Sequence, residues 1–98
     1  MPEDKTPLSD EEVENALQTL SGWERDGKFL VKNFTFENFT QINSFLPHMT
    51  TVICEQNHHP DLEFLPGKKS VFFRTTTHSH GGLTQADLNL AQALNNWL

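Results

Sequence analysis

Apolar residues recur along the chain at two spacings, one typical of helices and one typical of strands. The helical spacing predicts helices over residues 9–20, 36–55 and 84–98. Two of these begin with a cap signal, because Ser9 is followed three residues later by Glu12, and Thr84 by Asp87. In such a pair the hydroxyl and the carboxylate satisfy N–H groups of the first helical turn. The first and last helices therefore have defined starts.

The strand spacing predicts two hairpins. Residues 23–25 and 28–36 flank Asp26-Gly27, whose glycine supplies the positive φ of a tight turn, and residues 62–65 and 70–77 flank Pro66-Gly67. The order α-β-β-α-β-β-α then predicts an α+β fold, a four-stranded, mostly antiparallel sheet with helices packed on one face. We expect one domain over residues 1–98, with a loose N-terminal arm at residues 1–8.

The second helix has the longest apolar stripe. Its members run from Phe39 to Ile53, so we expect Phe39 to lie in the core, and Cys54 to be buried in the same stripe. Pro47 lies inside the helix and removes one backbone hydrogen bond, which predicts a kink.

Composition narrows the class of protein. Of the 98 residues, 36% are hydrophobic, including eight Phe and two Trp, which is enough for one core. The net charge of −6 disfavours direct binding to nucleic acid or to anionic membranes. One cysteine cannot form an intramolecular disulfide, and the polar start of the chain does not resemble a secretory signal or a membrane span. These features favour a cytoplasmic location.

The histidines are the candidate chemistry. His58 and His59 directly follow the second helix, and His78 and His80 end the last predicted strand. Imidazole can both donate and accept a proton near neutral pH, so histidines from two elements could serve acid–base catalysis in one pocket. The spacing of His78 and His80 also suits a metal site, and a purely structural role is a further alternative. We assign no functional role to His48, which lies alone on a helix.

Two segments and one carboxylate resemble a known family. The segments are Glu55–Pro60 (EQNHHP) and Thr77–Thr84 (THSHGGLT), and Asp87 follows them. Together they are similar to the pterin-4a-carbinolamine dehydratases. The resemblance extends over residues 9–97 and includes these positions: Trp23, Phe34, Phe36, Phe39, Phe45, Leu90 and Ala91.

The resemblance implies the same α+β fold, a homodimer or homotetramer, and hydro-lyase activity. The reaction is the dehydration of 4a-hydroxytetrahydropterin (4a-hydroxytetrahydrobiopterin) to quinonoid dihydropterin, a step in tetrahydrobiopterin recycling. It implies a pterin substrate, no metal and no further cofactor. Carried over by position, the catalytic residues are His58, His59 and His78, and the supporting residues are Asn57, Thr77 and Asp87.

Two departures from the family pattern support alternatives. Cys54 stands where the family usually has a glutamate, and the segment 61–69 is longer than usual. One alternative is a catalytically weak binding or regulatory member of the same fold that acts through a partner protein. A second is a metal-binding protein that uses the following residues: His58, His59, His78 and His80.

Overall fold

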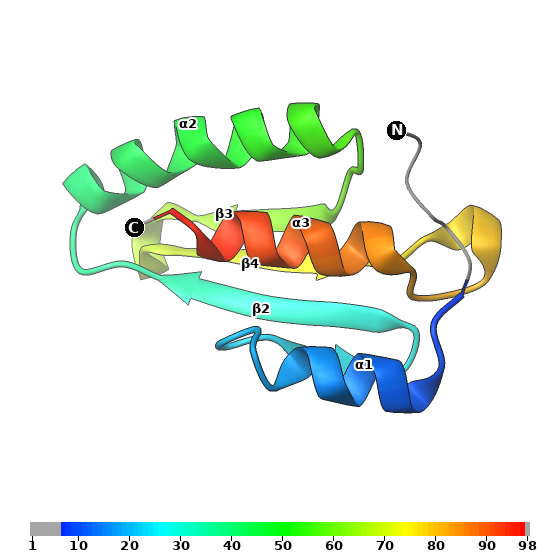
Figure 1. Ribbon diagram of the computed structural model, residues 1–98. Helices are drawn as coiled ribbons and strands as arrows, with labels where there is room; N and C mark the ends of the chain where they lie inside the picture. Colours follow the sequence, from blue (N-terminus) through cyan, green and yellow to red (C-terminus); the bar gives the residue numbers. More distant parts are fainter. Residues whose placement is uncertain (1–6, 98) are drawn as a thin grey trace.

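The structure, a computed structural model, describes residues 7–97 and contains three helices and four strands among them. The helices are α1 (Asp10–Leu17), α2 (Phe39–Gln56) and α3 (Gln85–Asn95). The strands are β1 (Glu24–Asp26), β2 (Phe29–Thr35), β3 (Asp61–Leu65) and β4 (Ser70–Thr75). The predicted order of elements is confirmed (Figure 1).

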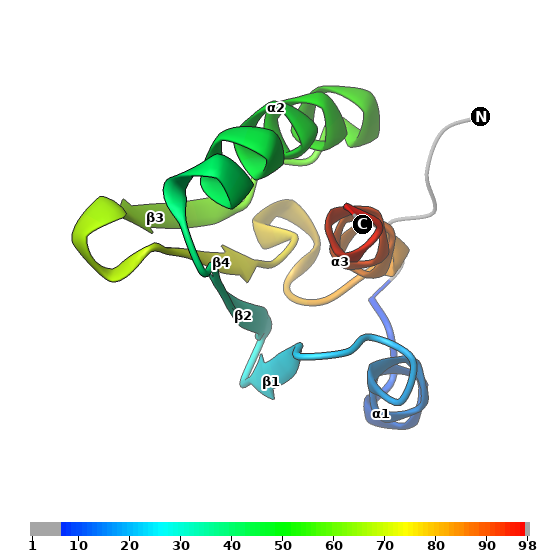
Figure 2. The same cartoon turned by 90° about the vertical axis from the view of Figure 1, so that its left-hand side faces the viewer.

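The strands form one antiparallel sheet in the order β1-β2-β4-β3. All three helices lie on the same side of this sheet, which Figure 2 shows end-on. Alternation along β2 and β4 sends Leu30, Phe34, Val71 and Phe73 toward the helices, where they are buried. The predicted α+β architecture is therefore confirmed.

The core lies between the helical layer and the inner face of the sheet. Phe45 of α2 lies at its centre, in ring contact with Phe34, Phe36 and Phe73. The buried apolar residues are Val13, Leu20, Trp23, Leu30, Phe34, Phe36, Ile42, Phe45, Met49, Val52, Val71, Phe73, Leu83, Ala86, Leu90, Ala91 and Leu94. Phe39 is an exception to the predicted stripe, because it opens α2 beyond the edge of the core and its exposed fraction is 52%.

Both predicted capping boxes are present. The Ser9 hydroxyl accepts a hydrogen bond from Glu12 N–H, and the Thr84 hydroxyl accepts one from Ala86 N–H. In return, the carboxylates of Glu12 and Asp87 accept hydrogen bonds from the N–H groups of Ser9 and Thr84. The predicted loose arm lies mostly outside the described residues. Its last residue is not loose, since Leu8 packs against the core and its N–H donates to Leu83 O at 2.8 Å.

The helix α2 continues across Pro47 and ends at Gln56, one residue beyond the predicted end at residue 55. His48 on the next position is half-buried, and its Nε2 lies 2.9 Å from the Ala93 carbonyl of α3. This contact joins the two helices, so His48 is accounted for by packing alone.

Candidate active site

The predicted site residues lie at one end of the sheet, on the right in Figure 1. There α2 ends and β3 begins, β4 ends, and α3 begins. The hairpin between β1 and β2 turns at the same end, because β2 starts opposite the end of β4. Segments far apart in the sequence therefore deliver their side chains to one region.

Asn57 sets the direction of the histidine pair. It ends α2 in the left-handed conformation (φ 49°, ψ 41°), which asparagine tolerates better than most residues, and its N–H donates to Cys54 O. The chain then turns so that His58 is buried, with an exposed fraction of 8%, while His59 is exposed. The adjacent histidines are thus in different environments.

The buried Asp87 carboxylate is the centre of a hydrogen-bond network. Its Oδ1 accepts from His58 Nε2 and from Thr75 Oγ1, each at 2.7 Å. Its Oδ2 accepts from Thr77 Oγ1 at 2.8 Å and from the Thr84 N–H at 2.9 Å. A side chain with no exposed surface therefore has both oxygens satisfied, and it caps α3 with the same group that holds His58.

Burial by itself raises the pKa of the Asp87 carboxyl, because it disfavours the charged form. The hydrogen bonds from His58, Thr75, Thr84 and Thr77 outweigh burial and hold this pKa below its ordinary value of 3.8. Asp87 is accordingly a carboxylate at neutral pH.

The ionised Asp87 carboxylate determines which nitrogen of the His58 ring carries the proton. A carboxylate can only accept hydrogen bonds, so Nε2 must carry a proton and donate it to Asp87. In the neutral ring the lone pair is then on Nδ1, and any proton exchanged with a ligand passes through that atom. Asp87 therefore fixes one tautomer of His58.

His78 lies in a turn and not on a strand. The prediction that His78 and His80 end the last strand is wrong, because β4 stops at Thr75 and His78–His80 form a 3₁₀ turn. The turn is closed by paired backbone hydrogen bonds between Thr77 and Gly82. Gly81 allows the reversal because its φ is 78°, a region that favours glycine.

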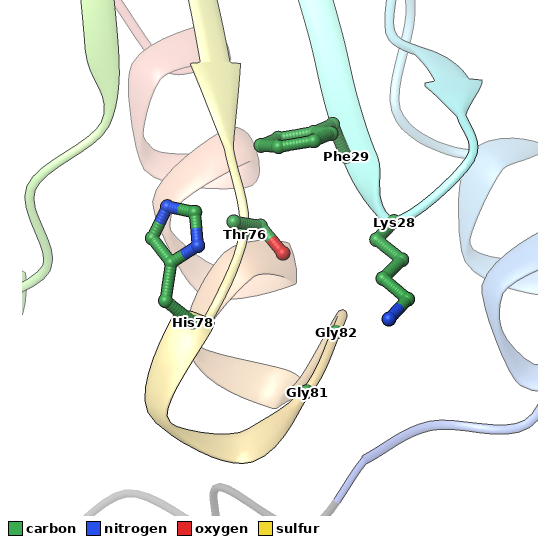
Figure 3. Close-up of a pocket in the computed structure, with 6 residues that line it drawn as sticks. All are labelled: Lys28, Phe29, Thr76, His78, Gly81 and Gly82. Atoms are coloured by element: carbon green, nitrogen blue, oxygen red, sulfur yellow. The ribbon is translucent and has the colours of Figure 1, made fainter.

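The exposed His78 ring borders a pocket of about 130 Å³ (Figure 3). The ring of Phe29, from β2, lies 6.1 Å from the His78 ring in an edge-on arrangement. The pocket is lined by Lys28, Phe29, Thr76, His78, Gly81 and Gly82.

The structure therefore brings His58, Thr77 and Asp87 into one network, with His78 directly after Thr77 in the chain. Asn57 and His59 lie beside this network and are exposed. Sequence reasoning missed Thr75 as a partner of Asp87. The signal was the run of threonines at residues 75–77, since residues two apart on a strand point to the same face.

The environment of Cys54 differs from the prediction. The thiol is exposed and not buried in the stripe of α2. Glu55, the next residue, is exposed as well. The position where the family usually has a glutamate therefore faces solvent near the end of α2.

Groups of three or more His, Cys, Asp or Glu side chains that could hold a metal ion do not occur among the described residues. His80, which the metal-binding alternative requires, has a side chain outside the described part of the chain. This alternative gains no geometric support from the side chains that are described. Among residues 7–97, no helix combines the length and the apolar character needed to cross a membrane.

Comparison with known proteins identifies the family. The model of the family described as pterin 4 alpha carbinolamine dehydratase matches residues 6–97. A protein of Thermomicrobium roseum that carries this activity as a provisional name is 36% identical over 87 residues, which is 89% of this chain and 91% of the relative. A similarly named protein of Roseiflexus sp. is 38% identical over 86 residues, covering 88% of this chain and 90% of the relative. The chain belongs to the pterin-4a-carbinolamine dehydratase family.

A solved structure supports the fold independently. The structure titled a transcriptional coactivator/pterin dehydratase from Brucella melitensis has a TM-score of 0.84 against this chain. The match covers 94% of this chain and 98% of that protein at 24% identity. The arrangement of helices and strands is therefore that of a known pterin dehydratase fold.

Proposed function

We propose that the chain dehydrates 4a-hydroxytetrahydropterin to quinonoid dihydropterin, as a hydro-lyase in tetrahydrobiopterin recycling. In this reaction the bond between C4a and the hydroxyl oxygen breaks, and the oxygen takes a proton and leaves as water. The N5–H bond gives up its proton, and its electron pair forms the N5=C4a double bond. One proton is donated and one is accepted, so no redox partner is needed.

In this proposal His58 and His78 form the acid–base pair. His58 accepts the N5 proton at Nδ1, because its Nε2–H is committed to Asp87 at 2.7 Å. His78, which is exposed on its turn, donates to the leaving oxygen. Each proton transfer contributes about 10²- to 10⁴-fold to the rate.

The remaining predicted residues have supporting roles. His59, exposed beside His58, orients the pterin, and Asn57 directs both histidines by ending α2. Thr77 donates to Asp87 and carries His78 as its neighbour in the chain. No metal or further cofactor takes part in the proposed step.

The observation that supports this function most strongly is the Asp87 network. A buried carboxylate that accepts four hydrogen bonds and fixes one histidine tautomer is more than a helix cap requires. A cap uses only the contact with the Thr84 N–H. The additional contacts hold an imidazole in one orientation at the end of the sheet, which is what acid–base catalysis needs.

The test is the dehydration of freshly generated 4a-hydroxytetrahydropterin, followed by ultraviolet absorbance. The wild-type protein should exceed the spontaneous rate, and His58→Ala and His78→Ala should each lose most of this acceleration. His48→Ala is the matched control, because it removes a histidine whose contacts with the Ala93 carbonyl and the Phe45 ring join α2 to the rest of the fold. No acceleration by folded wild-type protein would refute the proposal.

A structural role for the two exposed histidines is tested with His78→Ala and with one further variant, His59→Ala. If His59 and His78 support the fold, alanine at either position lowers the melting temperature as much as a core truncation does. Because both side chains are exposed, we expect the melting temperatures of the two alanine variants to stay near that of the wild type while the rate of dehydration falls.

The second candidate is a partner-binding role, alone or beside catalysis. The Brucella melitensis protein is titled a coactivator as well as a dehydratase. This chain also exposes four large hydrophobic side chains among the described residues: Phe39, Leu62, Phe64 and Phe72. A homodimer or homotetramer would cover part of this surface. Sedimentation of the purified chain measures the oligomeric state. A folded, oligomeric protein without dehydration activity would favour this candidate.

A further inference from the structure

The pocket beside His78 is lined by hydrogen-bond donors at its polar positions. These are the Lys28 ammonium, the Thr76 hydroxyl and the His78 imidazole (Figure 3). None of the residues that line it carries a carboxylate, although the chain has a net charge of −6. Within the described chain, Lys28 has no ion pair or hydrogen bond that would neutralise its charge. The polar lining therefore suits an anionic or electron-rich group.

Gly81 and Gly82 form the floor of the pocket and the Phe29 ring forms one wall, and neither part adds a free hydrogen-bond donor. The N–H groups of Gly81 and Gly82 are already used, since they donate to His78 O and Thr77 O within the turn. Both glycines have positive φ values, 78° and 157°, so a side chain at either position would be strained. The floor is therefore open to close approach but does not bind anions itself.

The aromatic wall is held in place before any ligand enters. The Arg74 guanidinium lies 3.9 Å from the centre of the Phe29 ring, and the His78 ring meets the Phe29 ring edge-on at an interplanar angle of 72°. A cation over a ring face and an edge-on neighbour are both favourable arrangements. Phe29 is thus a fixed surface against which a short group can lie.

The size of the pocket restricts what it can hold. Its volume of about 130 Å³ is smaller than that of pockets that enclose whole ligands, which are roughly 300–1,000 Å³. The pocket therefore accommodates a short substituent of a larger ligand and not the whole of such a ligand.

We infer that this pocket is a subsite for an acidic substituent on the pterin ring, and that Lys28 is the residue that determines this preference. The inference rests on the proposed function in that the ring system is taken to be a pterin. The subsite prefers a short carboxylate at the end of the ring over an apolar group of similar size. Lys28 acts on substrate choice and takes no part in the proton transfers.

The test measures binding without turnover. Fluorescence titration compares 6-carboxypterin with 6-methylpterin on the wild-type chain, on Lys28→Gln and on Lys68→Gln. Lys68 is the charge-matched control, since it is exposed in the turn at the opposite end of the sheet. We expect the wild type and Lys68→Gln to prefer the carboxylate by roughly three- to tenfold, as one solvent-accessible charged contact allows. Lys28→Gln should bind the two pterins equally.

The outcomes separate this inference from the proposed function. A wild type that binds both pterins equally, or a preference that survives in Lys28→Gln, would overturn the subsite even if dehydration is fast. A Lys28-dependent preference without dehydration would support the subsite and count against the enzyme. Failure to bind either pterin would overturn the subsite, and the dehydration assay would then decide the proposed function by itself.

Discussion

Replacing Asp87 by asparagine tests the link between the carboxylate network and the chemistry. The amide can keep one oxygen for Thr77 and the Thr84 N–H, as Oδ2 does now, and must then present its NH₂ group to Thr75 and His58. The Thr75 hydroxyl can rotate to accept. His58 can accept at Nε2 only by moving its proton to Nδ1, which removes the lone pair that the proposed reaction uses.

The magnitudes follow from these contacts. The rate of dehydration should fall by about 10²- to 10⁴-fold, the contribution of one positioned proton acceptor. The free energy of unfolding should fall by about 2–4 kcal/mol, because charge-assisted hydrogen bonds at a fully buried group are replaced by neutral ones. Asp10→Asn is the control. Asp10 is an exposed carboxylate, so the loss of its ion pair with Arg25 should leave the rate of dehydration and the free energy of unfolding nearly unchanged.

Three measurements check this reasoning together. The ultraviolet assay gives the rate, urea denaturation gives the free energy of unfolding, and ¹⁵N NMR of the imidazole nitrogens reports the tautomer of His58. We expect Nε2–H in the wild type and Nδ1–H in Asp87→Asn. A folded Asp87→Asn protein with the reversed tautomer and an undiminished rate would refute the assignment of Nδ1 of His58 as the proton acceptor.

Three further predictions concern stability. The pKa of Asp87 is lowered by folding, so its stabilisation of the fold is complete above pH 3.8 and is lost as the pH falls through the lower folded-state value. The free energy of unfolding should therefore decrease less steeply with falling pH in Asp87→Asn than in the wild type. Lys32→Met should cost only about 1 kcal/mol in urea denaturation, since the two acceptors of Lys32, Ser21 O and the Asn95 side chain, each keep another hydrogen bond; a loss above about 3 kcal/mol would contradict this account. His48→Ala should lower the free energy of unfolding by about 1 kcal/mol through its lost bond to α3 and should keep the wild-type rate, and a large loss of rate would show that His48 is not merely structural.

Much of the fold could be predicted because local chemistry and tertiary structure agree in this chain. The capping pairs define the starts of α1 and α3. The first hairpin forms as predicted, but its two-residue turn is Gly27-Lys28 and not Asp26-Gly27, because Asp26 already pairs with Phe29 and the positive φ of 60° falls on Gly27. Alternation along β2 assigns Leu30 and Phe34 to the buried face. These signals depend on neighbours within a few residues, so the sequence contains them in full.

The errors arise where burial is decided by distant parts of the chain. Phe39 and Cys54 have the spacing of a core residue, but they lie near the two ends of α2 and are exposed there. The sequence predicts a strand up to the histidines because Thr75–Thr77 has strong strand propensity. What ends β4 is the backbone pairing of Thr77 with Gly82, which periodicity does not reveal.

The site was only partly accessible to sequence reasoning. His58, His78 and Asp87 were found by their resemblance to a family, and the spacing alone indicated a histidine cluster without a purpose. Lys28 was missed because it comes from the β1–β2 hairpin, about fifty residues before His78 in the chain. Only the order β1-β2-β4-β3 makes these two residues neighbours.

The turn at Pro66–Lys68 joins β3 to β4 at the end of the sheet away from the histidines (Figure 1). Length added at this turn, within the segment 61–69, therefore lies away from the candidate active site, whereas Asp61 at the start of β3 lies at the same end of the sheet as that site. A Cβ atom at Gly67 would meet no described atom within 4 Å, and the turn exposes most of its residues. An affinity tag, a fluorophore or a surface anchor placed in this loop should therefore leave the candidate active site at the opposite end of the sheet accessible.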